Sequence, residues 1–260
     1  MKTHLFVAAL AALLLGASGA GASPAEGKPT IVLVHGAFAD GSSWNGVAER
    51  LERDGFPVVA VANPLRSVRG DATYVADILA GIAGPTVLVG HSYGGSVISE
   101  AAGSKTNVKA LVYVSAFAPD IGESASGLAC LNPGGTLGPA LAAPVHLSTG
   151  GSDLYIQQEN FAAQFAADVP AAEARLMAVA QRPVAEAALT EKATDAAWKR
   201  IPSWFVYGEA DLNIPPATIK FMAERAHARE AIAIPGGSHV VMVSHPDIVA
   251  EVIERAAADR

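Results

Sequence analysis

The chain has 260 residues, of which 51% are hydrophobic and 17% are charged, a composition that excludes intrinsic disorder and supplies enough apolar side chains for a sizeable core. Eighteen Lys and Arg residues against 25 Asp and Glu residues give a formal charge of −7, which argues against nucleic acid or an anionic membrane as a partner, because both require a basic face. The single cysteine, Cys130, excludes an intrachain disulfide framework and any metal site built from several cysteines.

The first 22 residues have the pattern of a secretory signal peptide. Lys2 precedes an apolar run of 11 residues, 5–15, and small residues follow. This run is too short for a membrane-spanning helix, which needs about 20 residues, but it suits the apolar region of a signal peptide. We predict cleavage after Ala20-Gly21-Ala22 and export of residues 23–260 to the periplasm or the medium, with no membrane span in the mature chain. A retained anchor or a free N-terminal helix is the alternative interpretation.

Beyond this segment, apolar β-branched runs alternate with helical patterns. A continuous apolar run such as residues 30–34 is typical of a strand buried on both faces of a sheet. Alternation at this spacing predicts a mainly parallel sheet with helices on both faces. The six predicted strands are residues 30–34, 57–62, 86–89, 108–114, 203–207 and 230–234, and the predicted helices are residues 47–54, 73–83, 94–104, 217–227 and 246–258.

One long segment, residues 119–200, interrupts the alternation. It contains no convincing buried strand, and a Gly- and Pro-rich stretch precedes helical patterns at residues 156–167, 171–180 and 186–198. Segments of this length in compact domains are usually lids or binding loops. We therefore predict one domain, residues 23–260, in which residues 119–200 form a helical cap over the strand ends. A surface excursion without a role is the alternative.

A G-x-S-x-G sequence, Gly90 to Gly94, lies between a predicted strand and a predicted helix. This context places Ser92 on a sharp turn, where glycines let neighbouring backbone approach without a Cβ clash. The helix that follows directs its first N–H groups at the site and favours negative charge there. The pattern predicts that Ser92 is a nucleophile.

A serine nucleophile needs a base, and the base needs an orienting acid. In enzymes with this turn, the acid and then the histidine follow the serine along the chain. Asp211 lies just beyond a strand, at the end of the sheet where ligands bind, with Glu209 as the alternative acid. His239 follows the last strand and a loop that can carry it back over Ser92. We predict Asp211 as the acid and His239 as the base, with His245 as the second candidate.

Two backbone N–H groups are expected to hold the oxyanion of an acyl-transfer intermediate. His35-Gly36-Ala37 ends the first strand on the same side of the sheet as Ser92. The residue after His-Gly and the residue after the nucleophile are placed to donate, which predicts Ala37 and Tyr93 as the oxyanion hole. We interpret His35 as a structural residue that holds the loop.

These features together resemble the α/β-hydrolase superfamily, and within it the small methylesterase and hydroxynitrile-lyase-like branch. The first loop with Trp44 beyond it and the segment 239–246 are similar to those of that branch. The resemblance covers residues 28–260 and implies the α/β-hydrolase fold. Members that cleave cyanohydrins have threonine in place of Gly36 and lysine in place of Val240, so the resemblance does not imply lyase activity.

The residues and the resemblance predict a secreted or periplasmic serine hydrolase that cleaves a small carboxylic ester through an acyl-enzyme. No metal or organic cofactor is implied, the expected partner is a small-molecule ester, and the oligomeric state is left open. A cofactor-free haloperoxidase or lyase on the same triad, or a ligand-binding protein with slow turnover, are the alternatives. The side chains expected to line the substrate pocket, although such residues also suit a core, are Phe38, Phe117, Tyr155 and Met242.

Overall fold

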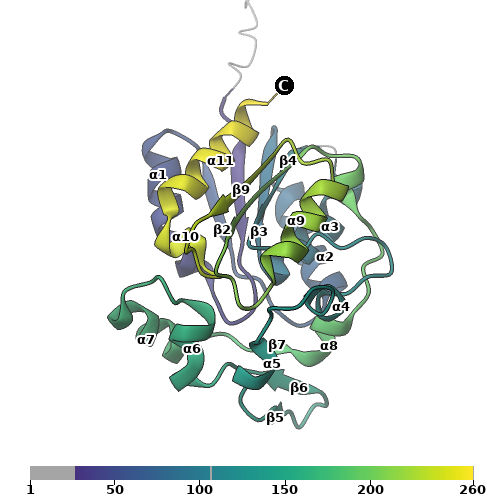
Figure 1. Ribbon diagram of the computed structural model, residues 1–260. Coiled ribbons are helices and arrows are strands. Elements are labelled where there is room, and N and C mark those ends of the chain that lie inside the picture. The colour runs from purple at the N-terminus through teal and green to yellow at the C-terminus, as the bar shows by residue number, and fades with distance from the viewer. Residues whose placement is uncertain (1–26, 106, 260) are drawn as a thin grey trace, which may run out of the picture.

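A six-stranded parallel sheet forms the centre of the molecule (Figure 1). The computed structural model describes residues 27–105 and 107–259. The strands run in the order β2-β1-β3-β4-β8-β9, and every neighbouring pair is parallel. Their bounds are β1 (Thr30–Val34), β2 (Val58–Val61), β3 (Thr86–His91), β4 (Val108–Val114), β8 (Ser203–Gly208) and β9 (Glu230–Ile234). The predicted sheet of six mainly parallel strands is confirmed.

The apolar composition of the central strands explains their position. β3 and β8 are buried along their whole length, as expected for parallel strands covered on both faces. Helices α1 (Asn45–Arg53) and α11 (Pro246–Ala258) pack against each other, and α2 (Val68–Ala80) packs on α3 (Tyr93–Ala101). Because all six strands are parallel, their carboxyl ends lie along one edge of the sheet, and the residues that follow these ends build the site described below.

The start of α2 differs from the prediction. The helix begins at Val68 rather than at residue 73, because the Ser67 hydroxyl accepts the Gly70 N–H at 3.0 Å and caps the first turn. The remaining helical elements around the sheet are η1 (Gly41–Trp44), η2 (Ala102–Ser104), α9 (Pro216–Arg225) and α10 (Val241–Ser244), where η denotes a 3-10 helix.

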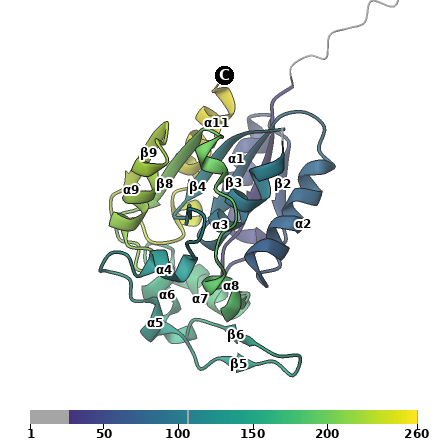
Figure 2. The ribbon, with the colours of Figure 1, turned by 90° about the vertical axis from the view of Figure 1, so that its right-hand side faces the viewer.

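Residues 119–200 form the cap, of which residues 137–190 lie at the lower end of the molecule in Figures 1 and 2. Helices make up much of this segment, as predicted for a helical cap, but three short strands that the sequence did not indicate also pair antiparallel in the order β5-β6-β7. These strands are too short to show an alternating pattern. The helix predicted at residues 186–198 also ends early, at Thr190. The cap contains α4 (Ala125–Ala129), α5 (Leu137–Ala140), β5 (Val145–His146), β6 (Ser152–Leu154), α6 (Gln158–Phe165), α7 (Ala171–Ala180), β7 (Val184–Ala185), α8 (Glu186–Thr190) and η3 (Ala197–Lys199).

Polar contacts tie the cap to the loop that follows β2. The Arg66 guanidinium pairs with Asp153 of β6 at 2.6 Å, and the Leu65 carbonyl accepts the Ala185 N–H at 2.9 Å. One contact joins side chains and the other joins backbone groups, so the small cap sheet is held at a fixed place relative to the carboxyl ends of the strands.

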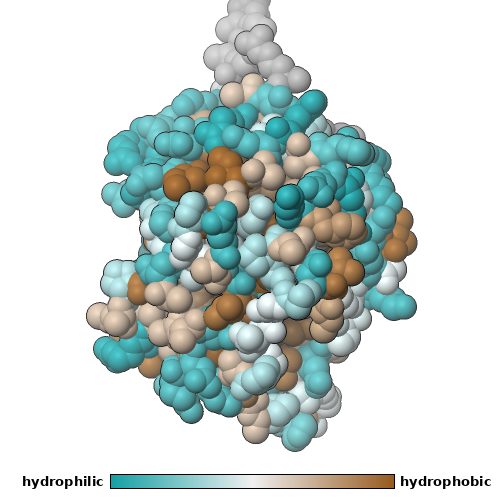
Figure 3. Space-filling model, viewed as in Figure 1, coloured by the Kyte–Doolittle hydropathy of each residue, from teal (hydrophilic) through white to brown (hydrophobic). Residues whose placement is uncertain are grey.

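The surface carries apolar residues in separate patches among hydrophilic ones on the face shown in Figure 3. Within the part of the chain that the structure describes, no helix is both long and apolar enough to cross a bilayer. The predicted signal peptide, residues 1–22, lies outside the described residues.

Candidate active site

Ser92 lies at the turn between β3 and α3. Its backbone has φ 53° and ψ −123°, a strained conformation for a residue with a side chain. Gly94 allows the turn, because a Cβ at this position would lie 2.5 Å from the Val34 carbonyl oxygen. The turn therefore packs tightly on the end of β1 and holds Ser92, 7% exposed, at the carboxyl edge of the sheet.

His239 and Asp211 are joined by a buried hydrogen bond. His239 Nδ1 lies 2.7 Å from Asp211 Oδ2. An ionised carboxylate only accepts, so the imidazole donates from Nδ1 and its Nε2 is left to accept a proton. The other oxygen of Asp211 accepts the N–H groups of Asn213 at 2.8 Å and Ile214 at 3.0 Å. These bonds fix the carboxylate, which in turn orients the imidazole.

The two alternative residues have other surroundings. Glu209, the alternative acid, is exposed beyond the end of β8. His245, the second candidate for the base, hydrogen-bonds through Nε2 to Asp168 of the cap at 3.1 Å. The structure therefore pairs Asp211 with His239 and pairs His245 with a cap residue.

The N–H groups of Ala37 and Tyr93 are available for a ligand. Ala37 lies in the loop after β1, and Tyr93 is the first residue of α3. Among the described residues neither N–H has a hydrogen-bond acceptor, and both residues line the same cavity as Ser92. Two such donors beside a serine are suited to an oxygen that becomes negative during reaction.

His35 supports the loop that carries Ala37. Its Nδ1 donates to the Gly36 carbonyl at 2.9 Å, and its Nε2 accepts the Asn63 N–H at 3.1 Å. These two bonds require a neutral imidazole, and burial lowers the pKa of His35 accordingly. His35 is thus a structural residue, as its position in the sequence suggested.

Two residues that support the site were missed by sequence reasoning. His91 Nε2 donates to the His239 carbonyl at 3.2 Å. The Tyr93 hydroxyl donates to buried Asp71 of α2 at 2.9 Å, and burial raises the pKa of Asp71. The only signal for His91 is its place beside Ser92, and no local signal indicates Asp71.

Comparison with known proteins identifies the family. The model of a family described as "Alpha/beta hydrolase family" matches residues 31–252. The chain belongs to this family. It is 28% identical to the alpha/beta hydrolase nvfD of Aspergillus novofumigatus (strain IBT 16806), over 89% of this chain and 98% of that protein. It is 33% identical to a carbendazim hydrolyzing esterase of Nocardioides sp. (strain SG-4G), over 37% of this chain and 46% of that protein.

A solved structure has the same fold as this alpha/beta hydrolase. Polyneuridine aldehyde esterase superposes with a TM-score of 0.76 at 20% identity, over 88% of this chain and 98% of that one. The likeness confirms the predicted α/β-hydrolase fold.

In this hydrolase, Ser92 and His239 face a small cavity of about 30 Å³. Phe38 and Phe117, two of the predicted pocket residues, line it, but Tyr155 and Met242 do not. Tyr155 follows β6 and lines a separate hollow on the cap, and Met242 is fully buried on α10. The structure therefore places these two residues outside the lining of the Ser92 cavity, and the sequence does not show which way side chains of short elements point. The full lining is Ala37, Phe38, Ser92, Tyr93, Phe117, Leu137, Phe165, Leu189, Asn213, Ile214 and His239.

We expect the folded hydrolase to lose stability in acid because of its buried histidines. Burial lowers the pKa of His35 and His91 below the ordinary 6.5, and the neighbouring His239 adds to the effect at His91. As the pH falls below that value, the unfolded chain binds protons that the folded chain excludes. The free energy of unfolding should therefore fall by up to about 1.4 kcal/mol per pH unit for each histidine. Urea denaturation between about pH 7.5 and pH 5 measures this slope.

A pair of variants isolates the contribution of His91. His91→Gln keeps an amide donor for the His239 carbonyl but does not titrate. It should therefore reduce the dependence of the unfolding free energy on pH by up to about 1.4 kcal/mol per pH unit, which corresponds to one proton. His146 is exposed, and His146→Gln is the matched control, which should leave the slope unchanged. Identical slopes for wild type and His91→Gln would contradict the expectation.

Proposed function

We propose that this protein is a serine hydrolase that cleaves a small carboxylic ester. The proposal rests on one arrangement: Ser92 and His239 line one cavity, His239 is hydrogen-bonded to Asp211, and the cavity is also lined by Ala37 and Tyr93, whose N–H groups have no acceptor among the described residues. Nucleophile, base, orienting acid and oxyanion donors are the parts that acyl transfer requires. The cavity walls are mostly apolar, which suits an uncharged ester.

The proposed reaction uses each of these groups in turn. Ser92 Oγ attacks the carbonyl carbon while its proton passes to Nε2 of His239, and the carbonyl oxygen becomes an oxyanion held by the N–H groups of Ala37 and Tyr93. His239 then protonates the alcohol as the ester C–O bond breaks, which leaves an acyl group on Ser92. Water, deprotonated by His239, then attacks the acyl carbon. The bond between this carbon and Ser92 Oγ breaks as His239 returns the proton to Oγ, which releases the carboxylic acid and restores Ser92. Asp211 holds the imidazole in position and stabilises its charged form.

Both the relatives and the loop after β1 support an ester as the substrate. The Nocardioides relative is named as an esterase. At position 36, a Cβ would lie 2.6 Å from Ser92 Cβ, so the threonine of cyanohydrin-cleaving members has no room here. Val240, where those members carry a lysine, is fully buried. These features favour ester hydrolysis over the lyase alternative.

Two measurements test the proposed function. A fluorophosphonate probe should form one adduct, and mass spectrometry of the digested protein should locate it on Ser92. With p-nitrophenyl acetate we expect sustained release of nitrophenol. A single stoichiometric burst without further turnover would indicate the ligand-binding alternative, and no label and no release would refute the proposal.

We further propose that the protein acts after export, because residues 1–22 have the pattern of a signal peptide. Mass spectrometry of the extracytoplasmic fraction should find a mature N-terminus at Ser23, or at Gly21 if the earlier small residues are used. An intact Met1 in a cytoplasmic pool would contradict export.

A further inference from the structure

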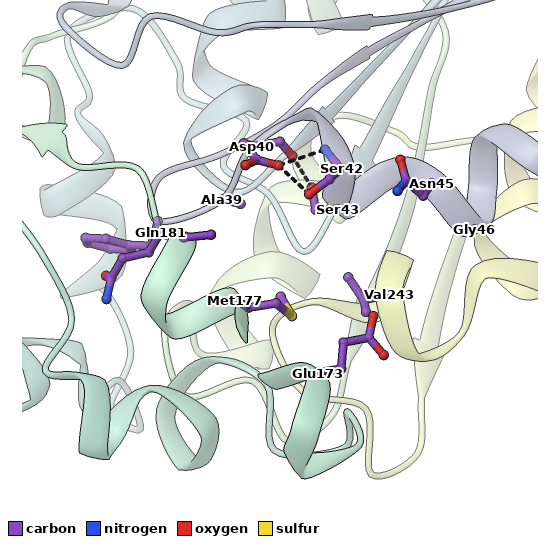
Figure 4. Close-up of a pocket in the computed structure, with 12 residues that line it drawn as sticks. Ala39, Asp40, Ser42, Ser43, Asn45, Gly46, Glu173, Met177, Gln181 and Val243 are labelled. Carbon is purple, nitrogen blue, oxygen red and sulfur yellow. Dashed lines mark hydrogen bonds between the residues drawn. The ribbon is translucent and has the colours of Figure 1, made fainter. Parts of the chain in front are cut away.

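A second cavity, of about 210 Å³, lies beside the Ser92 cavity and between the core domain and the cap (Figure 4). Residues within 38–46 and Val243 of α10 line it from one side, the core domain, and residues within 173–181 line it from the other side, the cap. We call it the α7 groove. Figure 4 shows Asp40, Ser42 and Ser43 on the first side and Glu173 and Met177 of α7 facing them. The groove is about sevenfold larger than the Ser92 cavity.

Phe38 is shared by the two cavities, since it lines both the α7 groove and the Ser92 cavity. Its position is fixed from several sides. The ring meets Phe165 edge-on, with centroids 6.1 Å apart, and the Phe38 N–H donates to the Arg182 carbonyl of the cap at 3.0 Å. The backbone φ of 60° is unfavourable for a bulky residue and persists only where the surroundings impose it. The side chain is therefore held firmly at a place where it borders both cavities.

We propose that Phe38 determines the size of ester that this site accepts. A volume of about 30 Å³ holds only a few atoms, so a long acyl or alcohol chain needs space that the Ser92 cavity does not offer. The α7 groove offers such space, and Phe38 separates it from Ser92. The wild-type protein then takes short esters, and shortening Phe38 joins the two cavities into one cleft. The inference rests on the proposed ester hydrolysis and names the substrate class within it.

The groove also indicates which chains it would admit. Met177 and Val243 give it an apolar surface, whereas Asp40 and Glu173 bring carboxylates to its walls, and no lysine or arginine is among the described residues that line it. A carboxylate at the end of a chain in the groove would be repelled. The chain admitted when Phe38 is shortened is thus apolar, with a neutral or cationic end.

The test compares esters of increasing chain length. Wild type and Phe38→Ala are assayed with p-nitrophenyl esters from acetate to decanoate and with acetates of the corresponding straight-chain alcohols. In at least one series, Phe38→Ala should raise kcat/KM for the longest ester relative to the shortest by about tenfold or more. Leu189→Ala is the matched control, because it shortens another wall of the Ser92 cavity without opening the groove, and it should give no comparable gain.

Filling the groove should cancel the gain. Ala180 is exposed on α7 and lines the groove, so Ala180→Trp narrows it without disturbing the core. The double variant Phe38→Ala/Ala180→Trp should regain the wild-type preference for short esters, and Ala180→Trp alone should leave the preference unchanged. If Phe38→Ala does not fold, Phe38→Leu removes less buried volume and should give a smaller gain in the same direction.

Terminal charge tests the second part of the inference. Phe38→Ala should raise kcat/KM less for a long ester that ends in a carboxylate than for the same ester ending in trimethylammonium. Adding Glu173→Gln should reduce this difference between the two esters. Equal gains for the two ends would refute the charge preference.

Several results would overturn the role of Phe38 as a wall. The first is that Phe38→Ala shows no rise in kcat/KM for long esters relative to short ones. The second is that this rise persists in the double variant Phe38→Ala/Ala180→Trp. The third is that Ala180→Trp alone lowers the turnover of long esters. If no ester is hydrolysed, the proposed function fails instead. The size limit can then be tested without turnover, by comparing how fast short- and long-chain alkyl fluorophosphonates label Ser92. Equal labelling rates in the wild type would refute the role of Phe38 as a size limit.

Discussion

Replacing Ser92 by alanine is expected to lower kcat/KM for a small ester on the order of 10³-fold or more, because the variant has no atom that can form the acyl-enzyme. Some acceleration over water should remain, since the N–H groups of Ala37 and Tyr93 and the cavity itself are unchanged. The fluorophosphonate adduct should disappear with the activity. Thermal unfolding should stay close to wild type, because the substitution keeps a Cβ at the strained backbone of position 92.

Ser96 provides the control for this experiment. It lies one helical turn further along α3, is 2% exposed, and its hydroxyl has no hydrogen-bond partner among the described residues. Ser96→Ala therefore removes a buried hydroxyl near the site without removing the nucleophile, and it should keep both activity and labelling. Undiminished labelling of Ser92→Ala would show that another serine reacts, and the assignment of the nucleophile would be wrong.

The sequence predicted the parts of the site that local patterns and strand order determine. Ser92, Asp211 and His239 each follow a strand, β3, β8 and β9 respectively, and parallel pairing brings the ends of those strands to one edge. The rule for chain order then distinguishes acid from base. Alternating strands and helices predict a parallel sheet, and a parallel sheet brings the residues after its strand ends to the same edge. The proximity of these three residues could therefore be predicted without knowledge of any contact between them.

The features that the sequence did not predict all depend on contacts between distant segments. The bond from His91 to the His239 carbonyl spans 148 residues, and nothing in either neighbourhood specifies it. The α7 groove exists only because residues 38–46 pack beside residues 173–181. The strands of the cap could not be predicted either. A strand of two or three residues is too short to show alternation of apolar and polar residues, and each of these strands forms only when its partner is present.

The second large effect concerns the base. His239→Ala should lower turnover by several orders of magnitude, on the scale seen when the histidine of such a triad is removed, because Ser92 then has no group to accept its proton. Labelling by the fluorophosphonate should slow as well, since it needs the same activation. The low-pH limb of the kcat/KM profile should also disappear, because this limb reports protonation of the base in the free enzyme. These profiles have to be measured where the protein stays folded, given the expected loss of stability in acid.

His245→Ala is the matched variant, since His245 lies only six residues further along the chain. Its imidazole bonds to Asp168 of the cap rather than to Asp211, so the variant should change turnover by no more than a few-fold and should keep the low-pH limb. If the two variants behave the other way round, His239 is not the base. The assignment of Asp211 would then fail with it, because an orienting acid acts only through a hydrogen bond to the base. Among the described residues, the imidazole to which Asp211 bonds is that of His239.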